Sequence, residues 1–109
     1  MKYNNTKTVV DGIKFDSKRE GARYLTLKHM EQDGLIQNLI LQPKFLLQDK
    51  FRYQGKAIRE INYIADFEYV QGGVTIVEDV KGMETKDFIL KKKLFLKQYG
   101  ENIDFRLVK

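Results

Sequence analysis

The strongest constraint on this 109-residue chain is a pair of strand-forming segments joined by a glycine turn. Residues 61–70 and 74–80 are rich in aromatic and β-branched side chains, which favour strands. Between them, Gln71-Gly72-Gly73 is typical of a tight turn. The pattern predicts an antiparallel hairpin, and the rest of the chain has to be arranged around it.

The register of this hairpin decides which acidic residues face one another. If Gly72 and Gly73 form a two-residue turn, Asp66 lies directly opposite Asp79 on the same face of the sheet. A three-residue loop would instead place Asp66 opposite Glu78 and turn Asp79 away. We prefer the first register because Lys81, two residues after Asp79, then shares the face of both aspartates.

The remaining segments predict one domain over residues 1–109. Val9 to Phe15 predicts a small hairpin with a type I′ turn at Asp11-Gly12. Two helices are expected, one over residues 17–33, capped by Asp16 or Ser17 and ended by Gly34, and one over residues 85–99, capped by Thr85 and ended by Gly100. Further strands are expected over residues 36–41 or 45–47, on either side of Pro43, and over residues 103–108. Residues 51–60 give no clear pattern, although Gln54-Gly55 is a candidate turn. The coarse order is helix, three strands, helix, strand.

Composition narrows the chemistry that is open to the chain. It has no Cys and a single His, so any metal must be held mainly by carboxylates and carbonyls, which suit Mg²⁺, Mn²⁺ or Ca²⁺. The formal net charge of +5 favours a polyanionic partner, chiefly nucleic acid, although many small soluble proteins are mildly basic. No apolar run has the length of a membrane span or the form of a signal peptide, so a cytoplasmic protein without membrane contact is expected.

Asp66, Asp79 and Lys81 together predict a phosphodiesterase site. Two opposed carboxylates repel one another, and a divalent cation is the natural compensation. Lys81 could steady the attacking water or the developing charge on phosphorus, and the carbonyl of Val80 is a further candidate metal ligand. The alternative is structural, because strand aspartates also cap loops or pair with surface lysines. That alternative is weaker for Asp66, which lies between Ala65 and Phe67 in an apolar segment.

Asp66 followed by Asp79-Val80-Lys81 resembles the signature of the PD-(D/E)XK nuclease superfamily, except that Ala65 rather than Pro precedes Asp66. More closely, the chain resembles a small phage and prophage family known as domain of unknown function 1064. The matching stretches cover most of the chain: residues 11–17 with Glu20, residues 63–67, residues 78–82 and residues 91–95. The resemblance implies an α/β fold with a restriction-endonuclease-like core, in which helices flank a mixed central sheet.

The resemblance also implies roles for residues of the two helices. Glu20 is expected to join Asp66 and Asp79 at the metal; alternatively, Ser17 and Glu20 form a capping box. Lys92 interrupts the apolar stripe of Phe88 and Phe95, which suggests a phosphate contact or a snorkelling side chain. The remaining candidates for contact with nucleic acid belong to a basic surface that equally serves solubility: Lys91, Arg19 and Arg23.

The expected activity is Mg²⁺- or Mn²⁺-dependent hydrolysis of DNA phosphodiester bonds. By analogy, the substrate is branched or recombining phage DNA, as for a Holliday junction resolvase, and the protein acts in the cytoplasm of the bacterial host. A domain this small grips two strands poorly, so a homodimer is expected. The competing interpretation is a non-catalytic DNA-binding or regulatory phage protein that retains the nuclease fold.

Overall fold

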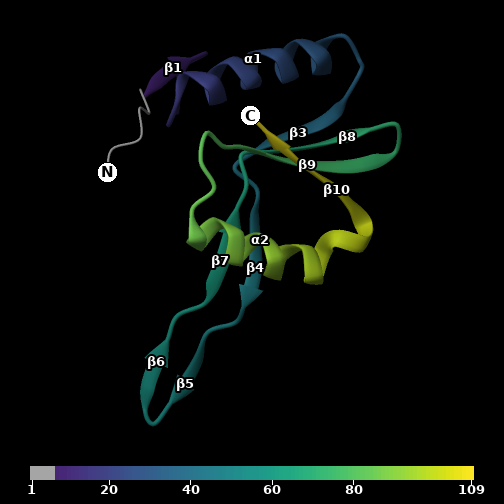
Figure 1. The fold of residues 1–109 in the computed structure, drawn as a ribbon. Coiled ribbons are helices and arrows are strands. Elements are labelled where there is room, and N and C mark those ends of the chain that lie inside the picture. Colours follow the sequence, from purple (N-terminus) through teal and green to yellow (C-terminus); the bar gives the residue numbers. More distant parts are fainter. Residues whose placement is uncertain (1–6) are drawn as a thin grey trace.

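The computed structural model describes residues 7–109, which form a mixed α/β fold (Figure 1). Two helices, one 3₁₀ turn and ten strands follow one another in this order: β1 (Thr8–Val10), β2 (Ile13–Phe15), α1 (Lys18–Gln32), β3 (Gln37–Leu41), β4 (Lys44–Gln48), β5 (Phe51–Tyr53), β6 (Lys56–Ile58), β7 (Ile61–Ile64), β8 (Phe67–Gln71), β9 (Val74–Val80), α2 (Lys86–Tyr99), the 3₁₀ turn (Gly100–Asn102) and β10 (Ile103–Val108).

The central sheet has the strand order β10-β9-β8-β3. β10 runs parallel to β9, whereas β8 is antiparallel to both β9 and β3. The two helices lie on opposite faces of this sheet, α1 on one side and α2 on the other (Figure 1). The predicted mixed α/β arrangement is therefore confirmed. No helix in the described part of the chain is both long and apolar enough to cross a membrane.

Each face of the sheet has its own apolar cluster, because successive side chains of a strand point to opposite faces. On the α1 side, Tyr24 and Leu27 pack with Phe67, Tyr69 and other side chains. A second cluster, on the α2 side, contains Tyr63, Ala65, Val77, Phe88 and Phe95. β9 contributes to both clusters, so its two acidic residues, which are adjacent in sequence, also point to opposite faces.

The predicted hairpin register is confirmed. Gln71 pairs with Val74 and Phe67 pairs with Glu78, which is the register of a two-residue turn. Three hairpin turns have positive φ at both central residues, as a type I′ turn requires. They are Asp11-Gly12, Gln54-Gly55 and Gly72-Gly73.

Both helices begin as expected but end differently. Ser17 caps α1 and Thr85 caps α2, each accepting a hydrogen bond from a backbone N–H. After α1, Gly34 has a φ of +78°, and Leu35 N–H donates to the Met30 carbonyl at 2.9 Å in a Schellman arrangement. The predicted role of Gly100 as a left-handed stop was wrong, because its φ is −63° and the chain continues into a 3₁₀ turn.

The predicted count of three strands between the helices was also wrong, because seven strands lie there. Residues 61–70 do not form one strand: the segment breaks at Ala65 and Asp66 into β7 and β8. The neighbouring chain breaks at Gln42 and Pro43, between β3 and β4. Hydrogen bonds cross both breaks, from Gln42 N–H to the Asp66 carbonyl at 2.9 Å and from Ala65 N–H to the Pro43 carbonyl at 3.1 Å.

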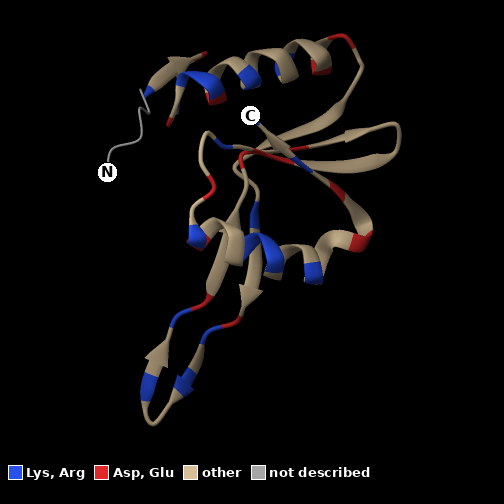
Figure 2. Cartoon of the chain, viewed as in Figure 1, with Lys and Arg blue, Asp and Glu red and all other residues tan. Residues whose placement is uncertain are grey.

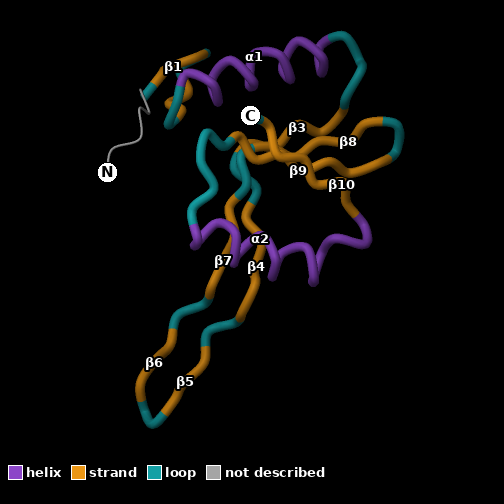
Figure 3. The backbone as a smooth tube through the Cα atoms, viewed as in Figure 1, coloured by secondary structure: helices purple, strands orange, loops and turns teal. Residues whose placement is uncertain are grey.

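The strands β3, β4, β7 and β8 therefore form one bent antiparallel ribbon (Figure 3). Its inner half belongs to the central sheet, and its outer half packs under α2. Beyond that half, the β5–β6 hairpin extends away from the domain (Figure 1). This extension explains a radius of gyration of 15.7 Å, compared with about 13 Å expected for a compact chain of this length.

Candidate active site

Asp66 lies at the bend of the ribbon, where β7 separates from β9. The paired ladder of β8 and β9 ends at Phe67 and Glu78, so Asp66 lies one position beyond it. Its backbone N–H donates to the Glu78 carbonyl at 3.0 Å. Its carboxylate accepts a hydrogen bond from the Val80 N–H at 2.6 Å. The break in the strand thus fixes the Asp66 carboxylate against the end of β9.

Asp79 is buried on the α2 side of β9 with 1% of its surface exposed. Its Oδ2 accepts a hydrogen bond from the Tyr63 hydroxyl. Its Oδ1 forms an ion pair with Lys81 Nζ at 3.2 Å, but it accepts no hydrogen bond from any described residue. A buried carboxylate oxygen normally has a hydrogen-bond donor. One oxygen of Asp79 is therefore open to a further partner.

Two lysine ammonium groups lie over the same aromatic ring beside Asp79. Lys81 Nζ is 4.8 Å from the centroid of Phe88, and Lys92 Nζ is 5.5 Å from it. Lys92 also forms an ion pair with Glu84 at 3.3 Å. Both lysine side chains are partly exposed, so a phosphate contact by Lys92 stays a prediction. Two positive charges therefore lie over the ring of Phe88, and one of them pairs with Asp79.

Glu20 projects from the first turn of α1 and is buried, with 7% of its surface exposed. Burial raises the pKa of its carboxyl, and the charges of Asp16 and Asp79 raise it further, whereas Lys81 lowers it. Ser17 Oγ accepts a hydrogen bond from Glu20 N–H at 3.1 Å, which is half of a capping box. Within residues 7–109 no reciprocal bond from the Ser17 N–H to the Glu20 carboxylate is formed. The side chain is thus left within the electrostatic field of the aspartates.

The carboxylates of the site carry more negative charge than their surroundings balance. Burial raises the pKa of Asp66 to about 8, and the charge of Asp79 adds to this rise, although the Val80 N–H opposes it. A carboxyl whose pKa is raised on folding loses stability as pH rises from its usual value through the raised one. At neutral pH the site consequently favours a bound cation or a bound proton.

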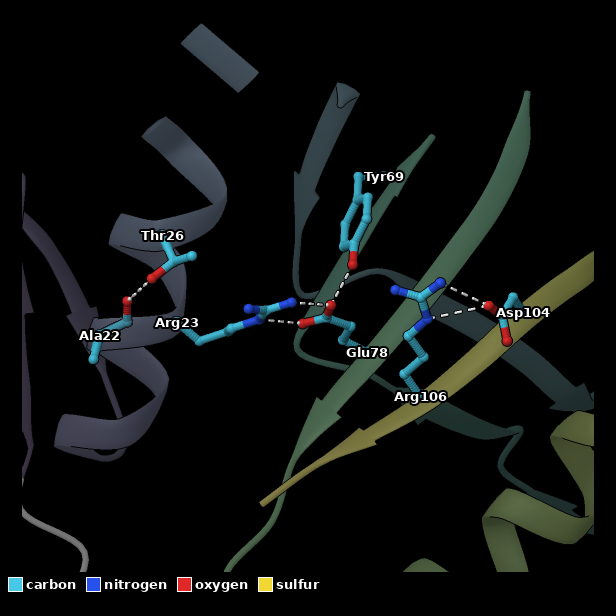
Figure 4. Close-up of polar contacts among 7 residues, drawn as sticks. All are labelled: Ala22, Arg23, Thr26, Tyr69, Glu78, Asp104 and Arg106. Carbon is cyan, nitrogen blue, oxygen red and sulfur yellow. Dashed lines mark hydrogen bonds and ion pairs between the residues drawn. The ribbon is translucent and has the colours of Figure 1, made fainter. Parts of the chain in front are cut away.

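Glu78 points to the opposite face and is completely buried there. Arg23 of α1 donates to both of its carboxylate oxygens, at 2.8 and 2.6 Å, and the Tyr69 hydroxyl donates to Oε2 (Figure 4). Both carboxylate oxygens of Glu78 therefore have hydrogen-bond donors. Glu78 is a structural residue, and Arg23, a predicted contact for nucleic acid, is used to neutralise it.

The other predicted basic residues also have partners within the chain. Arg19 Nη1 donates to the Lys81 carbonyl at 3.5 Å, which ties the start of α1 to the end of β9. Lys91 forms an exposed ion pair with Asp87 at 3.9 Å, one turn away on α2. Arg19 and Lys91 remain near the surface, so a contact with nucleic acid stays a prediction for both.

Comparison with known protein families assigns the chain to one of them. A family described as "Protein of unknown function (DUF1064)" matches residues 1–108. The chain belongs to this family. No curated protein and no solved structure matches it. The description of this family gives no activity.

The acidic residues of this chain fit a cation that takes most of its ligands from water and from the substrate rather than from the protein. No three His, Asp or Glu side chains of residues 7–109 form a metal-binding group by themselves. Mg²⁺, however, is usually held by one or two carboxylates together with waters and substrate phosphates. The open Oδ1 of Asp79 beside the Asp66 carboxylate matches that requirement.

Two residues of the site region could not be assigned a role from the sequence. Tyr63 of β7 holds Asp79 of β9 by donating a hydrogen bond to its carboxylate. Arg23 was expected at the surface but reaches the buried Glu78. A signal for this second pairing existed, because the register turns Glu78 away from Asp79 into an apolar face, where a buried charge needs a partner.

Proposed function

We propose that the protein is a metal-dependent nuclease of the PD-(D/E)XK type that hydrolyses phosphodiester bonds in DNA. The observation that supports this most is Oδ1 of the buried Asp79, which accepts no hydrogen bond from a described residue and pairs with the Lys81 ammonium at 3.2 Å, while the charge of Asp79 raises the pKa of Asp66. A purely structural aspartate would have both oxygens satisfied, as Glu78 has on the other face.

The fold supports the same proposal. A mixed sheet with α1 on one face and α2 on the other is what a restriction-endonuclease-like core requires. Asp66 comes from the bend of one strand, and Asp79 and Lys81 come from the end of its neighbour. Residues at strand ends are held rigidly by the sheet, which suits groups that have to be positioned around one phosphate.

In the proposed mechanism, Asp66 and Asp79 would hold the cation, and the Val80 carbonyl and Glu20 would complete its protein ligands. When bound, Mg²⁺ or Mn²⁺ supplies a polarised phosphate and a bound water of lowered pKa. Tyr63 keeps Asp79 in place through Oδ2, so that Oδ1 stays directed at the site. Lys81 stabilises negative charge that develops on phosphorus, and Phe88 holds its ammonium group there.

The substrate we propose is DNA, with branched or recombining phage DNA in the bacterial cytoplasm as the first choice. The support from this chain is the net charge of +5 together with the lysines that border the site. Junction specificity remains an analogy with other small phage nucleases and needs its own substrate test.

The experiment measures cutting of labelled four-way junction, nicked duplex and linear duplex DNA with Mg²⁺, with Mn²⁺ and with EDTA. We expect cutting that needs the metal and that falls by about a hundredfold or more in Asp79→Asn. Asp104→Asn is the matched control, because this carboxylate is exposed on the neighbouring strand β10 and, among residues 7–109, forms an ion pair with Arg106 alone. Equal activity of wild type and Asp79→Asn would overturn the proposal.

One observation favours a second candidate, a DNA-binding or regulatory protein that retains the fold without catalysis. Three acidic groups do not combine into a metal site by themselves in residues 7–109. A degenerate nuclease would show the same feature. Folded protein that binds DNA but cuts none of the three substrates with either metal would support this candidate.

A further inference from the structure

The β5–β6 hairpin and its flanking residues form an arm, residues 49–60, that has no use in the proposed catalysis. Every residue from 48 to 61 is exposed, including all of β5 and β6. Figure 1 shows the arm extending from the outer end of the bent ribbon, away from both helices. An exposed two-stranded hairpin is marginal by itself, and its large apolar side chains need a reason to be there.

We infer that this arm binds the sugar-phosphate backbone of duplex DNA. Four cationic residues lie within it: Lys50, Arg52, Lys56 and Arg59. No acidic residue interrupts positions 50–59, and Asp49 and Glu60 lie only at its base (Figure 2). In the described part of the chain, none of the four takes part in an ion pair. Unneutralised cations on an exposed hairpin are what a phosphate backbone requires.

The register divides the arm into two faces. Phe51 pairs with Ile58 and Tyr53 pairs with Lys56, so these side chains share one face. Arg52 pairs with Ala57 on the other face. The face that holds Lys56 also contains large exposed aromatic side chains, with Phe51 at 47% and Tyr53 at 62% exposure. The aromatic face can pack against sugars or bases while the cations contact phosphates.

The charges favour DNA over a second copy of the chain as the partner. The centre of a protein–protein interface is depleted of lysine, and two basic arms would repel one another. A two-stranded ribbon, in contrast, has dimensions that fit the major groove of duplex DNA. The arm is also continuous with the ribbon that contains Asp66, so DNA held by the arm would pass beside the site. In this respect the inference rests on the proposed function.

The test measures fluorescence anisotropy of labelled duplex and single-stranded DNA with full-length protein in EDTA, over a range of salt concentrations. The arm variant combines Arg52→Ala with Lys56→Ala. The control combines Lys93→Ala with Lys97→Ala, which removes the same charge from exposed positions on α2. We expect the arm variant to bind duplex about tenfold more weakly and to lose about two units of the slope of log affinity against log salt, whereas the control changes much less.

Three outcomes would overturn the inference that the arm binds duplex DNA, and a fourth would separate it from the proposed nuclease activity. Equal losses in both variants would mean that only net charge matters. Preference for single strands that depends on the arm would exclude the duplex as its partner. Unchanged DNA binding with a lower sedimenting mass would identify the arm as a contact between two copies. If wild type binds duplex through the arm but cuts nothing with Mg²⁺ or Mn²⁺, the proposed nuclease fails and the inference about the arm stands.

Discussion

At the scale of single residues, two adjacent acidic side chains of β9 have opposite roles. Glu78 is neutralised by Arg23 and Tyr69 on the α1 face. Asp79 is held through one oxygen and left open at the other on the α2 face. The alternation of a strand separates a stabilising carboxylate from one that is available for chemistry, so their substitutions should affect different properties.

We expect Arg23→Ala to lower the free energy of unfolding by about 3–5 kcal/mol, because it leaves a buried carboxylate without its partner. Arg106→Ala is the matched control, since Arg106 pairs with the exposed Asp104 at 3.0 Å and its loss should cost less than about 1 kcal/mol. Urea denaturation followed by circular dichroism measures both. Similar losses in the two variants would show that Glu78 needs no neutralisation.

For Asp66→Asn we expect the reverse effect on stability in metal-free buffer at neutral pH. The amide keeps an oxygen that accepts from Val80 N–H, and it removes the cost of either protonating this carboxyl on folding or burying its charge beside Asp79. The melting temperature should rise by roughly 4–8 °C, which corresponds to about 1 kcal/mol in a domain of this size. The gain should shrink as pH falls below about 8, because the wild-type carboxyl then becomes protonated. A lower melting temperature at neutral pH would contradict this account.

The sequence was sufficient to predict that Asp66, Asp79 and Lys81 lie close together, because a two-residue turn fixes the register of β8 and β9 and Asp66 lies one position beyond their ladder. It was insufficient for the partners that come from elsewhere. Tyr63 reaches Asp79 only because β7 bends away from β9, and Arg23 reaches Glu78 only because α1 crosses that face of the sheet. Such contacts depend on tertiary packing, which no local pattern contains.

At the scale of elements, the helices and turns were predictable and the interruptions of strands were not. Caps and glycine turns are local signals, and most of them were confirmed. The break falls at Ala65 and Asp66, which are both poor strand formers, but the aromatic and β-branched residues on either side of them masked this signal. It arises where β8 stays beside β9 while β7 leaves to pair with β4 beneath α2. Residues 51–60 were unassigned because the arm has no buried face to impose a pattern.

The arm should be dispensable for folding. Replacing residues 50–59 with Asn-Gly joins Asp49 to Glu60 through a two-residue hairpin turn. Since these residues are exposed, we expect the melting temperature to change by less than about 4 °C, which corresponds to less than about 1 kcal/mol. Thermal denaturation measures this directly. A larger loss would show that the arm stabilises the ribbon and has a structural role.

At the scale of the whole molecule, a homodimer remains a prediction. One slender domain presents one site, whereas cutting two strands calls for two. Leu90 and Leu94 lie one turn apart on α2 and are 58% and 44% exposed. Together they form an apolar surface that a second copy of the chain could cover. Sedimentation equilibrium should give twice the mass of one chain, and Leu90→Glu with Leu94→Glu should reduce it to a single mass. A wild-type protein that sediments as one chain would refute the prediction.

The bent ribbon also fixes the distance between the arm and the active site. Asp66 lies at one end of an antiparallel pair of strands, and the cationic hairpin lies at the other end. A strand rises about 3.3 Å per residue, close to the 3.4 Å between base pairs of DNA. The length of the ribbon would then set the distance along the DNA between the base pairs bound by the arm and the bond that is cut. Inserting two residues in each strand between Gln48 and Phe51 and between Ile58 and Ile61 should move the cut by about two base pairs along a bound duplex.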